Sequence, residues 1–347
     1  MPNHHALLRL PADQQWDTIA TFMVLRAAHY LSVFAGCAEL RINLPEPPPP
    51  VRETWVRALT RKKQPIRVLC GAEVPENTPL FIPGDYPVLL DDGSRINFGI
   101  PEIPGLTDFH LHTRFAYCCE NITVADALRL ECLNHVRFIN FAEHSGHLYA
   151  NKGNYNRDFR WRQSSPAENR TEEYLAFARA ETAPGCTFGL ELDVDSEYTV
   201  ADLRNPALSG FRIGAIHFLD PSLPPAAQRN DYLRRLDALI DAGIDIFAHA
   251  FRVFRRAGLP VPEDLFHPVA ERLVRAGVAA EINFHTNFPP EEFILEVLQR
   301  GGKISFGTDS HNLYEAGYLT PHWEFCRRIG IAGRLDEVLL SAAAGRR

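Results

Sequence analysis

Residues 231–250, DYLRRLDALIDAGIDIFAHA, contain the unit on which this fold is built. Apolar side chains recur every three or four residues over Asp231–Asp241, which predicts an amphipathic helix. The short apolar run Ile244–Ala248 then predicts a buried strand, and His249 follows it directly. A helix followed by a short apolar strand is typical of a parallel sheet whose strands are joined by helices.

The same alternation extends in both directions from this unit, over residues 105–347. The other short apolar runs are Leu106–Phe109, Val136–Phe141, Thr187–Leu192, Ile213–Phe218, Val278–Ile282 and Lys303–Phe306. Helical patterns lie between most of them, at Val124–Leu130, Glu172–Ala180, Glu263–Arg275 and Glu291–Leu298. Seven strands in about 240 residues favour a closed or nearly closed β/α barrel. An open doubly wound sheet is the alternative.

Residues 1–100 have a different pattern. The proline run Leu44–Pro50 predicts an extended, semi-rigid spacer. Short apolar pieces follow it, separated by the turn signals Pro83-Gly84 and Asp92-Gly93. We therefore expect a small, β-rich N-terminal segment, to which the sequence assigns no role.

Composition narrows the classes of function. With 46% hydrophobic residues, 23% charged residues and a net charge of −7, the chain has a soluble globular balance and no basic run for nucleic acid. The apolar stretch Ile19–Phe34 is too short to span a bilayer, and the N-terminus lacks a signal-peptide pattern. None of the seven cysteines has CxxC spacing, which favours reduced thiols in a cytoplasmic protein.

Every predicted strand ends in a potential metal ligand. In chain order these are His110 and His112, Glu143 and His144, Glu191, His217, His249, Glu281, and Asp309 and His311. The carboxyl ends of barrel strands meet around one mouth, where barrel enzymes have their active sites. His110 and His112 are two residues apart on an extended strand, so their side chains share a face.

This number of imidazoles and carboxylates exceeds what a single tetrahedral site uses, and it favours two or three ions. A lone buried histidine such as His217 is ordinarily a hydrogen-bonded core residue. Seven marked strand ends in order make a metal centre the stronger hypothesis. His285 follows the sixth strand closely, but we expect it in a surface loop. Histidines away from the strand ends, among them His147 and His322, receive no role.

These residues resemble the PHP (polymerase and histidinol phosphatase) metal-dependent phosphoesterases over about residues 105–335. The motifs are Asp108-Phe109-His110-Leu111-His112-Thr113, Ala142-Glu143-His144, Gly189-Leu190-Glu191, Ala215-Ile216-His217, Ala248-His249, Glu281-Ile282-Asn283 and Thr308-Asp309-Ser310-His311. The resemblance implies a distorted seven-stranded barrel, divalent zinc, manganese or iron, and hydrolysis of a small phosphomonoester or nucleotide-derived ester. It implies catalytic roles for Glu191, Asp309 and His249.

The same resemblance implies how the ions are held. His110, His112, Glu191 and Asp309 would bind the first ion. Glu191 would bridge to a second ion on His217 and His249. His144 and His311 would bind a third ion.

The chain departs from the family pattern at the third ion. Cys118 stands where a further histidine commonly falls, and Glu120 is a second candidate to complete the site. A thiolate can ligate zinc or iron. Cys118 can equally be a small apolar residue, which would leave the third site weak or empty while the first two ions remain.

Phosphate groups of a substrate need donors, and arginine binds phosphate through two parallel hydrogen bonds. The candidates are Arg114, Arg252, and Arg160 within the segment Arg157–Arg162. Solvated loop charges are the alternative for each of them.

Two other functions fit parts of the pattern. Amidohydrolase-like barrels also open with His-x-His and hydrolyse C–N bonds, but they usually rely on a carboxylated lysine, and none of these strand ends presents a lysine. A metal-stabilised sensor or partner module without catalytic activity is the third possibility.

Overall fold

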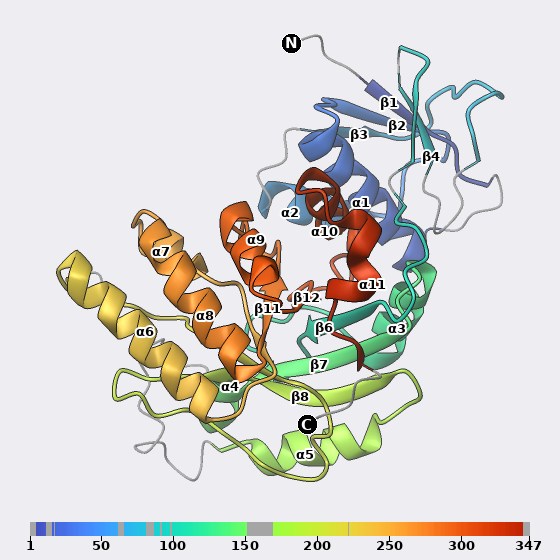
Figure 1. Cartoon of the computed structure of the whole chain (residues 1–347). Coiled ribbons are helices and arrows are strands. Elements are labelled where there is room, and N and C mark those ends of the chain that lie inside the picture. Colours follow the sequence, from blue (N-terminus) through green and yellow to red (C-terminus); the bar gives the residue numbers. More distant parts are fainter. Residues whose placement is uncertain are drawn as a thin grey trace. The chain divides into compact units, whose positions relative to one another are not determined.

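The computed structural model describes residues 5–11, 16, 18–61, 66–80, 87–90, 92–97, 99–150, 169–220 and 222–342 (Figure 1). Two compact units divide the chain: Met1–Glu102 with Leu133–His135, and Ile103–Cys132 with Val136–Arg347. Each unit has its own sheet.

The first unit contains a five-stranded mixed sheet with the strand order β3-β2-β1-β4-β5. Its elements are β1 (His5–Leu8), α1 (Thr18–Phe34), β2 (Glu39–Ile42), α2 (Pro49–Arg61), β3 (Arg67–Leu69), β4 (Pro87–Leu90) and β5 (Arg95–Asn97). Strands β1, β2 and β3 pair in parallel, and β4 pairs antiparallel with β1 and β5. The β4–β5 connection turns at Gly93, whose φ is +81°, as the Asp-Gly signal predicts.

The sequence prediction for this unit was incomplete. The strands are present, but two helices accompany them, and the apolar stretch beginning near Ile19 is part of α1. The proline run is not one extended spacer, because α2 begins at Pro49. Proline suits the first turn of a helix, where its missing N–H would have no intrahelical partner. Among the described helices, none has both the length and the apolar character needed to cross a membrane.

The second unit is a nearly closed barrel of seven parallel strands in the order β12-β11-β10-β9-β8-β7-β6. The strands are β6 (Thr107–Leu111), β7 (Phe138–His144), β8 (Cys186–Asp193), β9 (Arg212–Ala215), β10 (Ile246–Phe247), β11 (Ala279–Ile282) and β12 (Ile304–Phe306). All seven predicted strands are confirmed. The strand order follows the chain order, as successive strand–helix–strand units require.

The barrel closes between its first and last strands, which excludes the open doubly wound sheet. The backbone amide of Asp309 donates to the carbonyl of His110 at 2.7 Å, and that of His112 donates to the carbonyl of Ser310 at 3.1 Å. The buried carboxylate of Asp108 accepts from the backbone amide and the hydroxyl of Thr308, at 3.0 and 2.5 Å. These bonds join segments about 200 residues apart in the sequence.

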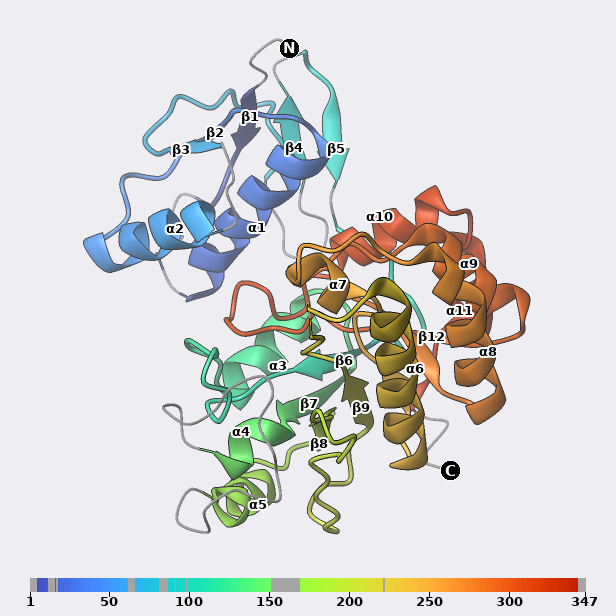
Figure 2. The ribbon, with the colours of Figure 1, turned by 90° about the vertical axis from the view of Figure 1, so that its left-hand side faces the viewer.

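Helices follow most of the strands. They are α3 (Val124–Leu133), α4 (Ser145–Tyr149), α5 (Thr171–Ala180), α6 (Pro225–Asp241), α7 (Arg252–Arg256), η3 (Glu263–Leu265), α8 (Phe266–Ala276), α9 (Glu291–Gln299), α10 (Thr320–Arg328), η4 (Ala332–Arg334) and α11 (Leu335–Val338). Helices α6, α8 and α9 lie side by side along the outside of strands β9 to β12 (Figure 2). The predicted helices are confirmed within a few residues, except that α6 begins earlier and 263–265 form a 3-10 turn.

One buried apolar cluster joins side chains from several barrel strands. Phe109, Ala142, Ile213, Ala215 and Ala279 are among the residues of this cluster, which the partly buried Leu340 and Ala342 also contact. Side chains two residues apart on a strand share a face. His144, His217 and Glu281 therefore lie one step above Ala142, Ala215 and Ala279 on the same inward faces.

Candidate metal centre

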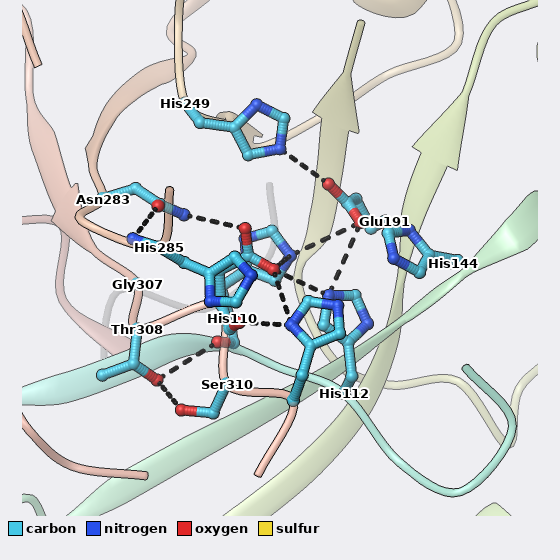
Figure 3. Close-up of polar contacts among 12 residues, drawn as sticks. His110, His112, His144, Glu191, His249, Asn283, His285, Gly307, Thr308 and Ser310 are labelled. Carbon is cyan, nitrogen blue, oxygen red and sulfur yellow. Dashed lines mark hydrogen bonds and ion pairs between the residues drawn. The ribbon is translucent and has the colours of Figure 1, made fainter. Parts of the chain in front are cut away.

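Glu191, at the end of β8, is the carboxylate around which the predicted ligands converge (Figure 3). Its side chain is fully buried. Its oxygens lie 2.5 Å from His144 Nδ1, 3.0 Å from His249 Nε2, 3.3 Å from His217 Nε2, 3.6 Å from His110 Nε2 and 3.7 Å from His112 Nε2. A carboxylate shared by five imidazoles from four strand ends is able to bridge cations, as the sequence prediction requires.

Asp309, which follows β12, provides the second shared carboxylate. Its Oδ1 lies 3.0 Å from His112 Nε2 and 3.7 Å from His110 Nε2. Its backbone has a φ of +53°, and that of His249 has a φ of +32°, both in the left-handed region that non-glycine residues rarely adopt. Such conformations gather at functional sites, where the surrounding structure maintains them.

Other groups fix the far nitrogens of these histidines. His110 Nδ1 lies 2.8 Å from Glu281 Oε1, and His217 Nδ1 lies 2.5 Å from Asp193 Oδ1. In each pair a proton on Nδ1 leaves the Nε2 lone pair facing Glu191. A carboxylate on the outer nitrogen of a histidine is the usual support of a metal-ligating imidazole.

The donor atoms fit metal ions. Within the described part of the chain, no well-oriented hydrogen-bond partner reaches the buried atoms His110 Nε2, His112 Nδ1, His144 Nδ1 and Glu191 Oε2. Burying such atoms without a partner is costly, and a coordinated cation removes that cost. Groups of three donors within 4.8 Å of one another include His110–His112–Glu191, His144–Glu191–His217 and His112–His144–His311. These buried clusters could bind metal ions.

The electrostatics favour cations. Burial by itself would raise the pKa of Asp309, but His110, Arg252 and His285 hold that pKa well below its usual range. Burial would lower the pKa of His112, but Asp309 and Glu143 raise it to about 9. At neutral pH the metal-free cluster therefore contains an ionised carboxylate and an imidazolium, and an ion that binds to His112 must displace its proton.

The candidate ligands of the third ion lie in more than one cluster. Cys118 is exposed and forms a three-donor group with His144 and His147. The Nδ1 of His147 accepts from the backbone amide of Tyr117 at 3.1 Å, which leaves the proton of a neutral ring on Nε2. Glu120 is exposed, and its backbone amide donates to the carbonyl of His311 at 2.8 Å.

His285 corrects an expectation. Its position after the sixth strand predicts a surface loop, but its side chain is only 9% exposed, and it forms a three-donor group with His311 and Glu315. Two local hydrogen bonds shape this loop: the amide of His285 donates to Asn283 Oδ1 at 2.9 Å, and Asn287 Nδ2 donates to the carbonyl of Asn283 at 3.1 Å.

The predicted substrate arginines have different surroundings. Arg252 is buried, and its guanidinium donates to Asp309 Oδ2 at 2.7 Å and lies 2.6 Å from His249 Nε2 and 3.3 Å from His217 Nε2. Arg114 is exposed, with its guanidinium 4.8 Å from the ring centre of Phe177 in α5. Arg160 and the rest of Arg157–Arg162 lie outside the described residues.

Several residues of the centre have a function that the sequence does not show. Glu281 is among the strand-end ligands that the sequence predicts, and Asp193 directly follows the predicted strand Thr187–Leu192. Their function as supports of His110 and His217 needs the three-dimensional pairing. Gly307 is a further one, because a side chain there would lie 2.0 Å from Glu281 Oε1 and 2.7 Å from His110 Cβ. A β-bulge between Asp108 and Leu111 turns both His110 and His112 toward the cluster above Phe109.

Comparisons with known proteins give no family. No family model matches the chain, and no curated protein matches it. Among solved structures, the chain is similar to an HpcH/HpaI aldolase from Desulfitobacterium hafniense DCB-2, at 8% identity over 96% of this chain and 95% of that one, with a TM-score of 0.21.

Proposed function

We propose that this chain is a metal-dependent phosphoesterase of the PHP kind, a cytoplasmic enzyme that hydrolyses a small phosphomonoester or a nucleotide-derived phosphate ester. The observation that carries the proposal is the fully buried Glu191 with five imidazoles around it, two of which have a second carboxylate on their outer nitrogen. This arrangement supports a centre of two or three divalent ions of zinc, manganese or iron. We expect no nucleic-acid or membrane partner.

Divalent ions held by these groups would supply a nucleophilic water at neutral pH and neutralise charge on the phosphoryl oxygens. The chain's own groups prepare the mouth for a phosphate. Glu191 and Asp309 would hold the cations, while Glu281 and Asp193 hold His110 and His217 in orientation. Arg252 places a permanent positive charge at the same mouth, but its guanidinium is held by Asp309 Oδ2 and lies against the Nε2 atoms of His249 and His217. To donate to phosphate oxygens, and to free those nitrogens for an ion, this guanidinium would have to move away from the imidazoles.

The test begins with the purified full chain. Bound metal is quantified by mass spectrometry, and phosphate esters, starting with p-nitrophenyl phosphate, are screened beside cyclic amides. We expect two or three equivalents of metal and phosphate release, both lost in His110→Ala and Asp309→Ala. His267→Ala, at an exposed histidine paired with Glu296, serves as the matched control and should change neither.

The outcomes separate the alternatives. Metal-free protein with undiminished activity in both variants would overturn the proposal. Turnover of cyclic amides without phosphate release would favour an amidohydrolase-like reaction. Tightly bound metal without turnover of any ester would favour a sensor or partner module.

A further inference from the structure

His285, His311 and Glu315 form a cluster of three donor groups on the side of the centre formed by the loops after β11 and β12. Their exposed fractions are 9%, 5% and 6%, and one donor atom from each lies within 4.8 Å of the others. The two imidazole rings stack with their centres 4.6 Å apart and their planes at 23°. In Figure 3, His285 and His144 lie on opposite sides of the drawn cluster.

His311 has its tautomer fixed for ligation. Its Nδ1 lies 2.7 Å from the backbone carbonyl oxygen of Asp309. A carbonyl oxygen can only accept, so Nδ1 carries the proton and donates. The lone pair is therefore on Nε2, the state in which neutral imidazole binds a metal, with the outer nitrogen bound to a carbonyl as in many metal sites.

Glu315 is oriented by one of its two oxygens. Its Oε2 accepts from Asn312 Nδ2 at 3.0 Å and from the backbone amide of His311 at 3.3 Å. Its Oε1 lies 3.2 Å from His285 Nδ1. One oxygen thus holds the carboxylate in place, and the other faces the imidazoles.

The backbone of His285 is fixed as firmly. Its amide donates to Asn283 Oδ1 at 2.9 Å, and its carbonyl accepts from Arg252 Nη1 at 3.3 Å. Asn283 in turn donates to Glu281 Oε2 at 2.9 Å, which ties this loop to the carboxylate that supports His110. The three donors are therefore held before any ion binds, as a preorganised site requires.

The geometry points to a divalent transition-metal site formed by His285, His311 and Glu315, which holds the third ion of the centre in place of Cys118 and Glu120. Two imidazoles and one carboxylate are the ligands of zinc in several hydrolases and of non-haem iron(II). This inference rests on the proposed metal centre but not on its activity toward phosphate esters. His311 is a ligand in both cases, so the choice is between His285 and Glu315 on one side and Cys118 and Glu120 on the other.

The test compares variants by metal content. The full chain is stripped with a chelator, dialysed against Zn²⁺ and analysed by mass spectrometry, and Co²⁺ loading followed by visible absorption reports the ligand set. We expect His285→Gln and Glu315→Gln each to bind about one equivalent less than wild type. Cys118→Ser and the exposed control His267→Gln should bind as much as wild type.

The opposite pattern overturns the inference: wild-type content in His285→Gln and Glu315→Gln, or the loss of an equivalent in Cys118→Ser. A wild-type chain that binds no Zn²⁺ also overturns it. If a variant fails to fold, anomalous scattering at the zinc edge from wild-type crystals decides the question, because the ion lies beside either Glu315 or Cys118. The two proposals can fail separately. If the chain hydrolyses no phosphate ester but Glu315→Gln still binds one equivalent of metal less than wild type, the proposed function is overturned and the metal site is supported.

Discussion

The apolar interior of the barrel and the donors above it are built on the same strand faces. We call these donors the ring of donors, or the ring: His110, His112, His144, Glu191, His217, His249 and Asp309. On β7, Ala142 belongs to the interior and His144 to the ring of donors. Ala215, the last residue of β9, and His217, two residues beyond it, are the corresponding pair. A step of two residues, about 7 Å along the strand, changes the surroundings from hydrocarbon to carboxylates and imidazoles.

The two regions stabilise different things. The interior lowers the free energy of the fold, because burial of apolar surface and close packing act without any ligand. The ring buries charged and polar groups that satisfy one another only in part, so it costs stability until a cation binds. Substitutions in the interior should therefore change folding, and substitutions in the ring should change metal binding.

The largest effect is expected in the ring at Glu191, which contacts five imidazoles. Glu191→Gln removes the shared charge and should lower metal affinity and any phosphate release by more than about 100-fold, beyond the range for residues that only orient a ligand. Isothermal titration with Zn²⁺ measures the affinity. Glu181→Gln, at an exposed residue just after α5, is the control, and equal affinity in the two variants would contradict the comparison.

A comparable effect, but on folding, is expected in the interior at Ile213, which is fully buried in β9. Ile213→Ala should lower the free energy of unfolding by about 2–5 kcal/mol, because it deletes buried methylene groups and leaves a cavity. Denaturant unfolding of the stripped protein gives the value, and Val56→Ala, at a residue that is 59% exposed, is the control. Loss of bound metal from the folded variant would show that the two regions are not separable.

A smaller effect is expected one layer behind the ring, at Glu281. Glu281→Gln weakens the hold on His110 Nδ1 and should reduce metal affinity by about 10- to 100-fold while the fold persists. Gly307→Ala should act in the same direction, because the added methyl group displaces the same carboxylate. Zn²⁺ titration of both variants beside Glu271→Gln, on the exposed side of α8, measures the effect. Wild-type affinity in both would remove Glu281 from the centre.

The last effect is expected from pH, and it is the smallest when taken per pH unit. The raised pKa of His112, about 9 against an ordinary 6.5, stabilises the stripped protein below pH 6.5, and that stability is lost as the pH rises through about 9. Metal must displace the same proton, so affinity should rise by up to about tenfold per pH unit over this window. The gap in melting temperature between metal-loaded and stripped protein should then widen from pH 6.5 to 9. A constant gap would show that His112 is not protonated in the stripped centre.

Much of the barrel could be predicted from the chain alone, because strand–helix alternation is a local pattern. The run Ile244–Ala248 and the helical period of Asp231–Asp241 each lie within a few turns of sequence, and both are confirmed. In the N-terminal unit, the local sequence pattern predicted the strands but not the helices α1 and α2. The helix beginning at Pro49 was missed, since a proline run favours an extended chain unless the residues after it provide an amphipathic face to pack.

The donor set was visible for the same reason, since each ligand follows the apolar run of its own strand. The position of His285 could not be predicted in the same way, because its loop is held by contacts that the local pattern does not show. Asn283 and Asn287 form hydrogen bonds within the loop, and Arg252 of α7 donates to the carbonyl of His285. That Glu281 supports His110, and that position 307 needs glycine, could not be recognised, because both depend on distances to His110 across about 170 or more residues of chain.

The sequence by itself determined the order of strands and helices, and the residue type that ends each strand, because period and composition are properties of neighbouring residues. Only the tertiary structure decided which donors meet. Barrel closure through Asp108 and Thr308, the bulge in β6, and the left-handed backbone at His249 and Asp309 bring atoms from seven strand ends to within a few ångströms. Such distances depend on how the strands pair around the barrel, which no single segment of the chain specifies.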